Sequence, residues 1–255
     1  MPRKKSAIRG RVAAAVAAVS LVLTVSGCTT LNTTSPESAR AQKDGPKGKF
    51  GPVDCRKAKC VALTFDAGPA KDTPHLLDIL KEKKVHATFF LLGKNHVVKH
   101  PDLVRRIADE GHEVANHTWS HQILTDKNES EIREELSRTQ DAIAKITGRK
   151  PILMRPPQGR TDDEVTKVSK ELGLSQVLWS VTAKDYSTTD SDLIKKRVLE
   201  QVDRDGIILL HDIYDGTVPA VPGIIDALKK RGYTFVTVPQ LLAPGVPEPG
   251  TVYRP

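Results

Sequence analysis

The chain has 255 residues, enough for one sizeable α/β domain with short extra segments. Its hydrophobic content of 38% and charged content of 27% are those of an ordinary soluble globular protein. The formal net charge is +8, but five basic residues lie before residue 12, and the rest of the chain carries only +3. The charge therefore gives no reason to expect a nucleic acid partner, and no basic patch interleaved with aromatic residues follows.

The first 27 residues have the pattern of a secretion signal. Five basic residues precede an apolar run over residues 12–25, which is too short to span a bilayer comfortably. The run ends in the letters VSGC, which resemble a bacterial lipobox. This resemblance implies cleavage before Cys28, a lipid on its thiol and a membrane anchor on the outer face of the bacterial cell. An ordinary signal and an uncleaved membrane anchor remain the alternatives.

Residues 28–52 are rich in Thr, Ser, Pro, Gly and Lys and have no apolar periodicity, so we expect a flexible tether there. If Cys28 carries a lipid, the remaining cysteines are Cys55 and Cys60. An exported protein meets oxidising conditions, which permit a disulfide between these two residues. Two free thiols are the alternative.

From Cys60 onward, short apolar runs alternate with segments of helical periodicity. We predict strands over residues 61–65, 87–92, 113–116, 152–155, 176–181, 206–211 and 233–237. We predict one helix that begins at Thr73, which is its N-cap. Further helices are predicted over residues 102–110, 129–147, 162–172, 191–204 and 219–231. This alternation predicts one α/β domain with about seven parallel strands covered by helices. The strand count favours a closed or distorted barrel over an open doubly wound sheet.

In a βα barrel the chemistry lies on loops at the carboxyl ends of the strands. The polar residues found near predicted strand ends are Asp66, His117, His121, Arg155, Asp185 and His211. The spacing of four between His117 and His121 suits one zinc ion, although two exposed or capping histidines could share it. An Asp shortly before Gly-Pro, such as Asp66 two residues before Gly68, is also common in turns. We expect Trp179 in the core.

Five segments in chain order, TFDAG, HTWSH, RPPQG, VTAKDY and LLHD, resemble the five motifs of carbohydrate esterase family 4. These are the polysaccharide deacetylases with a NodB-type homology domain. The resemblance covers residues 59–238 and leaves residues 239–255 as a C-terminal extension. It implies a distorted (β/α) barrel and metal-assisted hydrolysis of acetamides or acetate esters. A zinc protease does not fit, because HTWSH lacks the Glu that follows the first His of HExxH.

The resemblance assigns acid–base roles to four matching residues. It implies that Asp66 is the general base that activates water and that Arg155 tethers this carboxylate and favours its ionised form. It also implies that His211 is the general acid that protonates the leaving amine. Asp185 would pair with His211, favour the imidazolium and fix its orientation.

The resemblance also assigns the binding residues. His117 and His121 would be ligands of a divalent metal, zinc or alternatively cobalt. The backbone N–H of Gln158 would join the metal in binding the oxyanion, and Leu209 would line the pocket for the acetyl methyl.

The chain departs from the family pattern at the metal site. Ala67 stands where the family has a second Asp, its third metal ligand, so two imidazoles would bind metal more weakly unless another carboxylate such as Asp66 helps. In the fourth motif, Thr182 replaces a common Asp and Tyr186 a common Trp.

We expect a monomeric N-deacetylase at the cell surface that acts on an acetylated glycan, either peptidoglycan or a chitin-like polymer. The base, the acid, both histidines and the arginine of the family pattern are present, which favours an active or weakly active enzyme. An esterase that removes O-acetyl groups, as from acetylxylan, is one alternative. A glycan-binding protein that releases no acetate is the other, and Ala67 is its motivation.

Overall fold

The computed structural model describes residues 1–2, 31–41 and 53–255, and Asn32–Pro255 form one compact unit. Residues 3–30, which include the apolar run of the predicted signal and Cys28, and residues 42–52 of the expected tether lie outside the described residues. Within the described ranges, no helix combines the length and the apolar character that crossing a bilayer requires.

The described residues contain a single sheet of nine strands, and all its paired strands are parallel. In chain order the strands are β1 (Lys59–Asp66), β2 (Thr88–Leu91), β3 (Glu113–Asn116), β4 (Leu153–Met154), β5 (Ser175–Val177), β6 (Val181–Thr182), β7 (Ile207–Leu210), β8 (Tyr233–Val236) and β9 (Val252–Tyr253). Their order across the sheet is β6-β7-β1-β2-β3-β4-β5-β9, with β8 paired to the amino-terminal half of β1.

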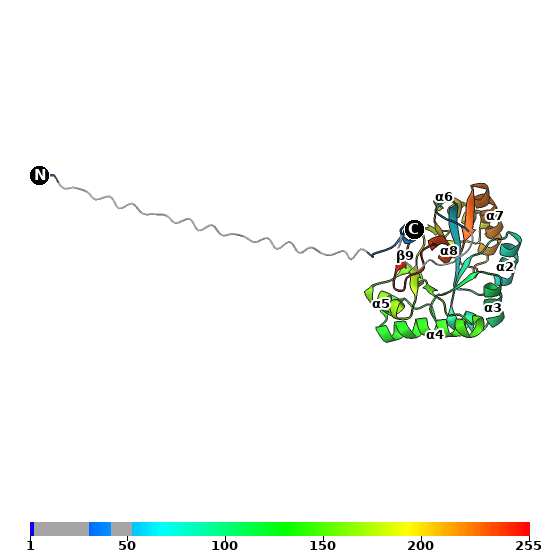
Figure 1. Ribbon diagram of the computed structural model, residues 1–255, viewed down its shortest axis with the longest axis horizontal. Coiled ribbons are helices and arrows are strands. Elements are labelled where there is room, and N and C mark those ends of the chain that lie inside the picture. Colours follow the sequence, from blue (N-terminus) through cyan, green and yellow to red (C-terminus); the bar gives the residue numbers. More distant parts are fainter. Residues whose placement is uncertain (3–30, 42–52) are drawn as a thin grey trace. The chain divides into compact units, whose positions relative to one another are not determined.

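Helices cover the outside of the strands (Figure 1). They are α2 (Thr73–Glu82), α3 (Pro101–Asp109), α4 (Glu129–Thr147), α5 (Asp163–Glu171), α6 (Ser191–Gln201) and α7 (Thr217–Lys230). The central strand β1 is buried from Cys60 to Asp66 and pairs with β7 on one edge and with β2 and β8 on the other. The fold is therefore a distorted (β/α) barrel of parallel strands, which confirms the predicted fold class.

Helix α4 has the predicted bounds because both of its ends carry strong sequence signals. The Asn128 side chain accepts a hydrogen bond from the Glu131 backbone N–H at 3.1 Å, and the Glu131 carboxylate accepts one from the Asn128 N–H at 3.1 Å. Gly148 ends the helix at φ 76°, in the left-handed region that favours glycine. Helix α2 differs in its cap: Asp72 is the N-cap residue, and the Thr73 hydroxyl bonds to Asp212 instead.

The strand predicted over residues 176–181 is wrong, because the chain changes partner within it. The N–H of Leu178 bonds to the carbonyl oxygen of Tyr253 on β9 at 2.8 Å. Two residues later, the N–H of Ser180 bonds to the carbonyl oxygen of Ile207 on β7 at 3.2 Å. The segment therefore forms β5 near one end of the strand order and β6 at the other, and it carries the chain across the barrel.

The C-terminal residues, expected as an extension of the domain, pack against the barrel. Residues Val238–Leu242 form helix α8, and β9 pairs with β5. The Tyr253 side chain on β9 is 1% exposed, and its hydroxyl accepts a hydrogen bond from the Glu248 N–H at 3.0 Å.

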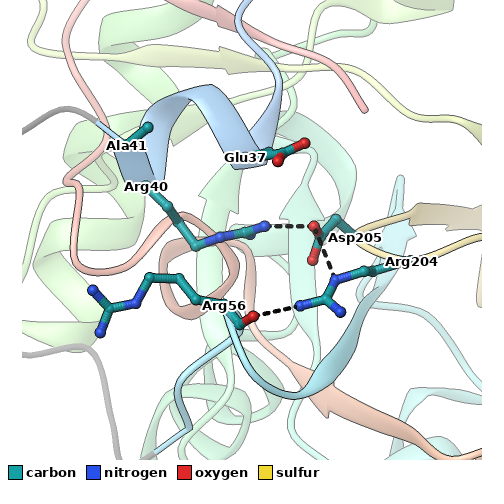
Figure 2. Close-up of a pocket in the computed structure, with 6 residues that line it drawn as sticks. All are labelled: Glu37, Arg40, Ala41, Arg56, Arg204 and Asp205. Carbon is teal, nitrogen blue, oxygen red and sulfur yellow. Dashed lines mark hydrogen bonds and ion pairs between the residues drawn. The ribbon is translucent and has the colours of Figure 1, made fainter.

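A short helix, α1 (Pro36–Ala41), lies where the sequence predicted part of the tether. Arg40 on this helix donates to the carbonyl oxygen of Leu241 at 2.8 Å and pairs with Asp205 (Figure 2). Buried contacts made by Ala39 and Arg40 hold this segment to the domain, and composition could not reveal them. Nearby, Cys55 and Cys60 form the expected disulfide, with Cα atoms 5.5 Å apart.

The C-terminal strand should contribute measurably to stability. Tyr253→Ala should lower the free energy of unfolding by about 3–5 kcal/mol, as for other large aromatic side chains removed from a core. Urea denaturation followed by circular dichroism measures this, with the exposed neighbour in Arg254→Ala as the matched control. A loss below about 1 kcal/mol for Tyr253→Ala would show that β9 adds little to the domain.

Candidate active site

The predicted site residues converge on one pocket at the carboxyl ends of the strands. The pocket has a volume of about 520 Å³. Six predicted residues line it: Asp66, His117, His121, Gln158, Leu209 and His211. Arg155 and Asp185 are almost fully buried and contact Asp66 and His211 respectively. The parallel sheet brings these residues together because every strand ends on the same side of the barrel.

Asp66 is the last residue of β1 and forms a buried ion pair with Arg155. The Arg155 Nη1 donates to Asp66 Oδ1 at 2.6 Å and to Thr64 Oγ1 at 2.8 Å. The Arg155 side chain is fully buried, and its guanidinium lies 4.1 Å from the centre of the Phe90 ring. A buried carboxylate requires such a partner. The pairing occupies Oδ1 and leaves Oδ2 on the side of the pocket where His117 lies.

His117 follows β3 in a state suited to binding a metal. Its Nδ1 lies 2.9 Å from the carbonyl oxygen of Arg155, so this nitrogen carries the proton and donates it. The other nitrogen, Nε2, therefore has a free lone pair and lies 3.8 Å from Asp66 Oδ2. Burial lowers the pKa of His117 to about 4, against weaker opposition from the Asp66 charge. The ring is thus neutral at pH 7, as metal binding requires.

His121 completes a pair of neutral imidazoles. Its ring centroid lies 4.9 Å from that of His117. One side of His121 reaches solvent, but the surrounding protein desolvates the rest and lowers its pKa, with a smaller contribution from the repulsion of His211. The two predicted ligands are therefore neighbouring neutral imidazoles that both line the pocket.

The two histidines fit a divalent metal as two of its nitrogen ligands. A catalytic zinc site usually has three protein ligands, so this site has one ligand fewer. Among the residues that the structure describes, no group of three or more His, Cys, Asp and Glu side chains is arranged to hold a metal ion. Ala67, at the position of the family's third ligand, has φ 66°. Asp and Asn adopt this left-handed conformation more readily than Ala does. The backbone thus retains a conformation suited to an aspartate, although the carboxylate itself is missing.

His211 faces the same pocket from the end of β7 and is held by Asp185. Asp185 Oδ1 lies 2.9 Å from His211 Nδ1, and Oδ2 accepts bonds from the His211 backbone N–H at 2.7 Å and the Thr217 hydroxyl at 2.8 Å. Burial lowers the pKa of His211, but the hydrogen bond and charge of Asp185 outweigh burial and leave this pKa raised. His211 therefore holds its proton more tightly than an ordinary histidine does.

Gln158 lines the pocket and has a backbone N–H without a partner among the described residues. It has φ 57° within a turn fixed by Pro156 and Pro157. Its N–H has no acceptor among the described residues, whereas the next N–H, of Gly159, bonds to the Pro156 carbonyl oxygen at 2.9 Å. A free N–H at a pocket wall can bind an oxyanion. Leu209 also lines the pocket and is 6% exposed.

Aromatic residues form a rim that the sequence did not predict. The Tyr214 ring lies 5.4 Å from the His211 ring, and the exposed Tyr186 ring lies 6.3 Å from it. Trp179 packs against the core, as predicted, and also lines the pocket. Tyr214 lies three residues beyond the histidine of LLHD, and no sequence pattern marked it.

A second pocket, of about 480 Å³, lies at the opposite, amino-terminal side of β1 and β7 (Figure 2). Arg40 and Arg204 both approach Asp205, and Arg204 donates to the Arg56 carbonyl oxygen at 2.9 Å. Arg40, Arg204 and Asp205 thus bond to one another and to main-chain carbonyls. The lining of this pocket holds no histidine, so the chemistry of an acid, a base and a histidine pair belongs to the first pocket.

The chain is similar to known deacetylases. A family model described as polysaccharide deacetylase matches residues 54–177. The chain is 39% identical over 184 residues to peptidoglycan-N-acetylglucosamine deacetylase PgdA of Listeria monocytogenes, which is 72% of this chain but only 39% of that protein's length. It is 40% identical over 186 residues to a peptidoglycan-N-acetylglucosamine deacetylase of Bacillus cereus, which covers 71% of this chain and 67% of that protein.

Solved structures of this family are also similar to the chain. The structure of a T48 deacetylase with substrate is 40% identical and superposes with a TM-score of 0.76 over 79% of this chain and 100% of its own. A pseudoenzyme of carbohydrate esterase family 4 from Bacillus anthracis is 29% identical, with a TM-score of 0.70 over 77% of this chain and 70% of its own. The chain belongs to the polysaccharide deacetylase family.

Proposed function

We propose that this chain is a metal-dependent hydrolase that removes N-acetyl groups from an amino-sugar polysaccharide, with peptidoglycan as the favoured substrate. One observation carries the proposal: Asp66 and His211 face one pocket, and each is held by a buried partner of opposite charge. Such a pair separates the roles of base and acid. The similarity to peptidoglycan deacetylases of Listeria and Bacillus supports the choice of substrate.

The acid–base chemistry follows from this arrangement. The Asp66 carboxylate accepts a proton from a water molecule as that water attacks the acetyl carbonyl carbon. The carbonyl oxygen becomes negatively charged and accepts a hydrogen bond from the Gln158 N–H. His211 then donates its proton to the sugar nitrogen as the C–N bond breaks, which releases acetate and leaves a free amine on the glycan. Leu209 gives the acetyl methyl an apolar wall.

A divalent metal, zinc or alternatively cobalt, held by His117 and His121 would supply Lewis-acid polarisation of the acetyl carbonyl. His117 is prepared for this role because its Nδ1–H is held by the Arg155 carbonyl oxygen, which directs Nε2 toward Asp66. With Ala67 in place of a third ligand, water or substrate must fill the remaining positions.

The proposal includes export and a lipid anchor at Cys28, since a peptidoglycan substrate lies outside the cell membrane. The lipobox-like letters VSGC are its basis.

A glycan-binding protein on the same scaffold is the competing function. Ala67 favours it, and the similarity to a family 4 pseudoenzyme shows that this fold also occurs without activity. The retained base, acid and histidine pair favour the enzyme.

Acetate release decides between these functions. The protein should release acetate from peptidoglycan and from N-acetylglucosamine oligomers when Zn²⁺ or Co²⁺ is added, and chelation should abolish the release. Asp66→Asn should reduce kcat by about 10²- to 10⁴-fold, because it removes the general base. Release from acetylated xylan alone would indicate an O-acetyl esterase. Folded, glycan-binding protein that releases no acetate from any substrate would establish the binding protein.

The pH–rate profile tests the role of His211. A general acid must be protonated, so activity should fall as the pH rises through the raised pKa of His211. Asp185→Asn removes the charge that raises this pKa, so the basic limb of the kcat profile should move to lower pH. Thr217→Ala removes one hydrogen bond to Asp185 but leaves the charge, and it serves as the control. An unchanged basic limb in Asp185→Asn would exclude His211 as the acid.

A further inference from the structure

The turn that joins His117 to His121 has an unfavourable backbone. Thr118 has φ 71° and His121 has φ 62°, both in the left-handed region. This conformation is costly for residues other than glycine, above all for a β-branched residue such as Thr118. It persists only where neighbouring groups determine it.

Side chains within the turn and just before it satisfy two of its backbone donors. The N–H of Thr118 donates to Asn116 Oδ1 at 2.8 Å, and the N–H of His121 donates to Thr118 Oγ1 at 3.0 Å. The Asn116 side chain in turn donates to the carbonyl oxygen of Leu136 on helix α4 at 2.8 Å. The turn is thus tied to α4 on one side.

Glu135, also on α4, holds the middle of the turn with both carboxylate oxygens. Its Oε2 accepts hydrogen bonds from the backbone N–H groups of Trp119 at 3.0 Å and Ser120 at 2.8 Å. Its Oε1 accepts a bond from the Ser120 hydroxyl at 2.6 Å. Among the described residues, no Lys or Arg pairs with Glu135, so these donors are its partners. Charge-assisted bonds of this kind are stronger than neutral ones.

The opposite side of the turn rests on the chain that follows β2. The N–H of Gly93 donates to the Thr118 carbonyl oxygen at 3.1 Å, and the N–H of Lys94 donates to that of Trp119 at 2.8 Å. A Cβ on Gly93 would lie 2.2 Å from the Trp119 ring, so only glycine leaves room there. The turn is therefore held between this segment and Glu135.

We infer that Glu135 is a positioning residue that fixes the turn between His117 and His121 so that both imidazoles face one metal ion. The inference rests on the proposed metal-binding role of the two histidines. Glu135 itself does not line the pocket and makes no hydrogen bond to either imidazole. It acts through the backbone of Trp119 and Ser120. With only two histidine ligands and Ala67 at the third position, metal binding depends strongly on their preorganisation.

Two measurements on matched variants test this. Zn²⁺ affinity is measured by competition with a chelating dye, and amide hydrogen exchange at Trp119 and Ser120 is measured on the metal-free protein. Glu135→Ala should raise the Kd for Zn²⁺ by about 10- to 100-fold, the usual effect of losing a partner outside the ligand shell. It should also increase exchange at these two amides. Glu135→Gln should fall between Glu135→Ala and wild type, because its carbonyl oxygen can still accept both N–H bonds.

Glu134→Ala is the matched control. Glu134 is the preceding residue on α4, its side chain is exposed, and it pairs with Arg138, which lies over the Trp119 ring. It should match wild type in both measurements, which also tests for effects passed through Arg138.

The inference would be overturned if folded Glu135→Ala bound Zn²⁺ as tightly as the wild type does. It would also be overturned if Glu134→Ala lost as much Zn²⁺ affinity as Glu135→Ala. If wild-type protein binds no Zn²⁺, the proposed metal role fails separately. The metal-free exchange data still decide on Glu135, because unchanged protection of both amides in Glu135→Ala would show that it does not hold the turn.

Discussion

The ion pair between Asp66 and Arg155 determines how the rest of the site is built. It joins β1 to the end of β4, strands that are not neighbours in the sheet, so it spans the barrel interior. Arg155 acts twice: its guanidinium holds the Asp66 carboxylate, and its carbonyl oxygen holds His117 Nδ1. One residue therefore orients the proposed base and one proposed metal ligand. Apolar replacements of buried ion pairs often preserve stability, so the chemistry of the site gives a better reason for this pair than stability does.

Neighbouring groups give two histidines of one pocket opposite properties. His117 places its Nδ1–H on a neutral carbonyl oxygen in a buried position, and burial lowers its pKa to about 4. His211 places the same atom on the Asp185 carboxylate, which outweighs burial and raises its pKa. Near neutral pH, the first therefore offers a lone pair and the second retains a proton more strongly. Metal binding and proton donation need these two different states.

The sequence predicted the fold where local patterns were long and well capped, as in α4. It failed where tertiary pairing decides: residues 176–181 change partner strand, and two-residue strands such as β9 are too short for a periodicity. The site residues were likewise predictable where a motif marked them and not where tertiary contacts alone bring them to the site. Motif order identified the residues that the structure brings to one pocket, but Tyr214 and Glu135 lie outside the motifs. Their contacts with the site form only in the folded chain.

We propose that Ala67 weakens metal binding and leaves the acid–base chemistry intact. The most direct test is the Zn²⁺ dependence of acetate release by wild-type protein and Ala67→Asp, with Ala67→Asn as control for the backbone at φ 66°. We predict that Ala67→Asp needs about tenfold less Zn²⁺ for half-maximal activity, equivalent to about 1.4 kcal/mol of binding free energy, with the same rate at saturation. Wild-type protein that stays inactive at saturating Zn²⁺ while Ala67→Asp releases acetate would contradict the claim, because the chemistry itself would then require the missing carboxylate.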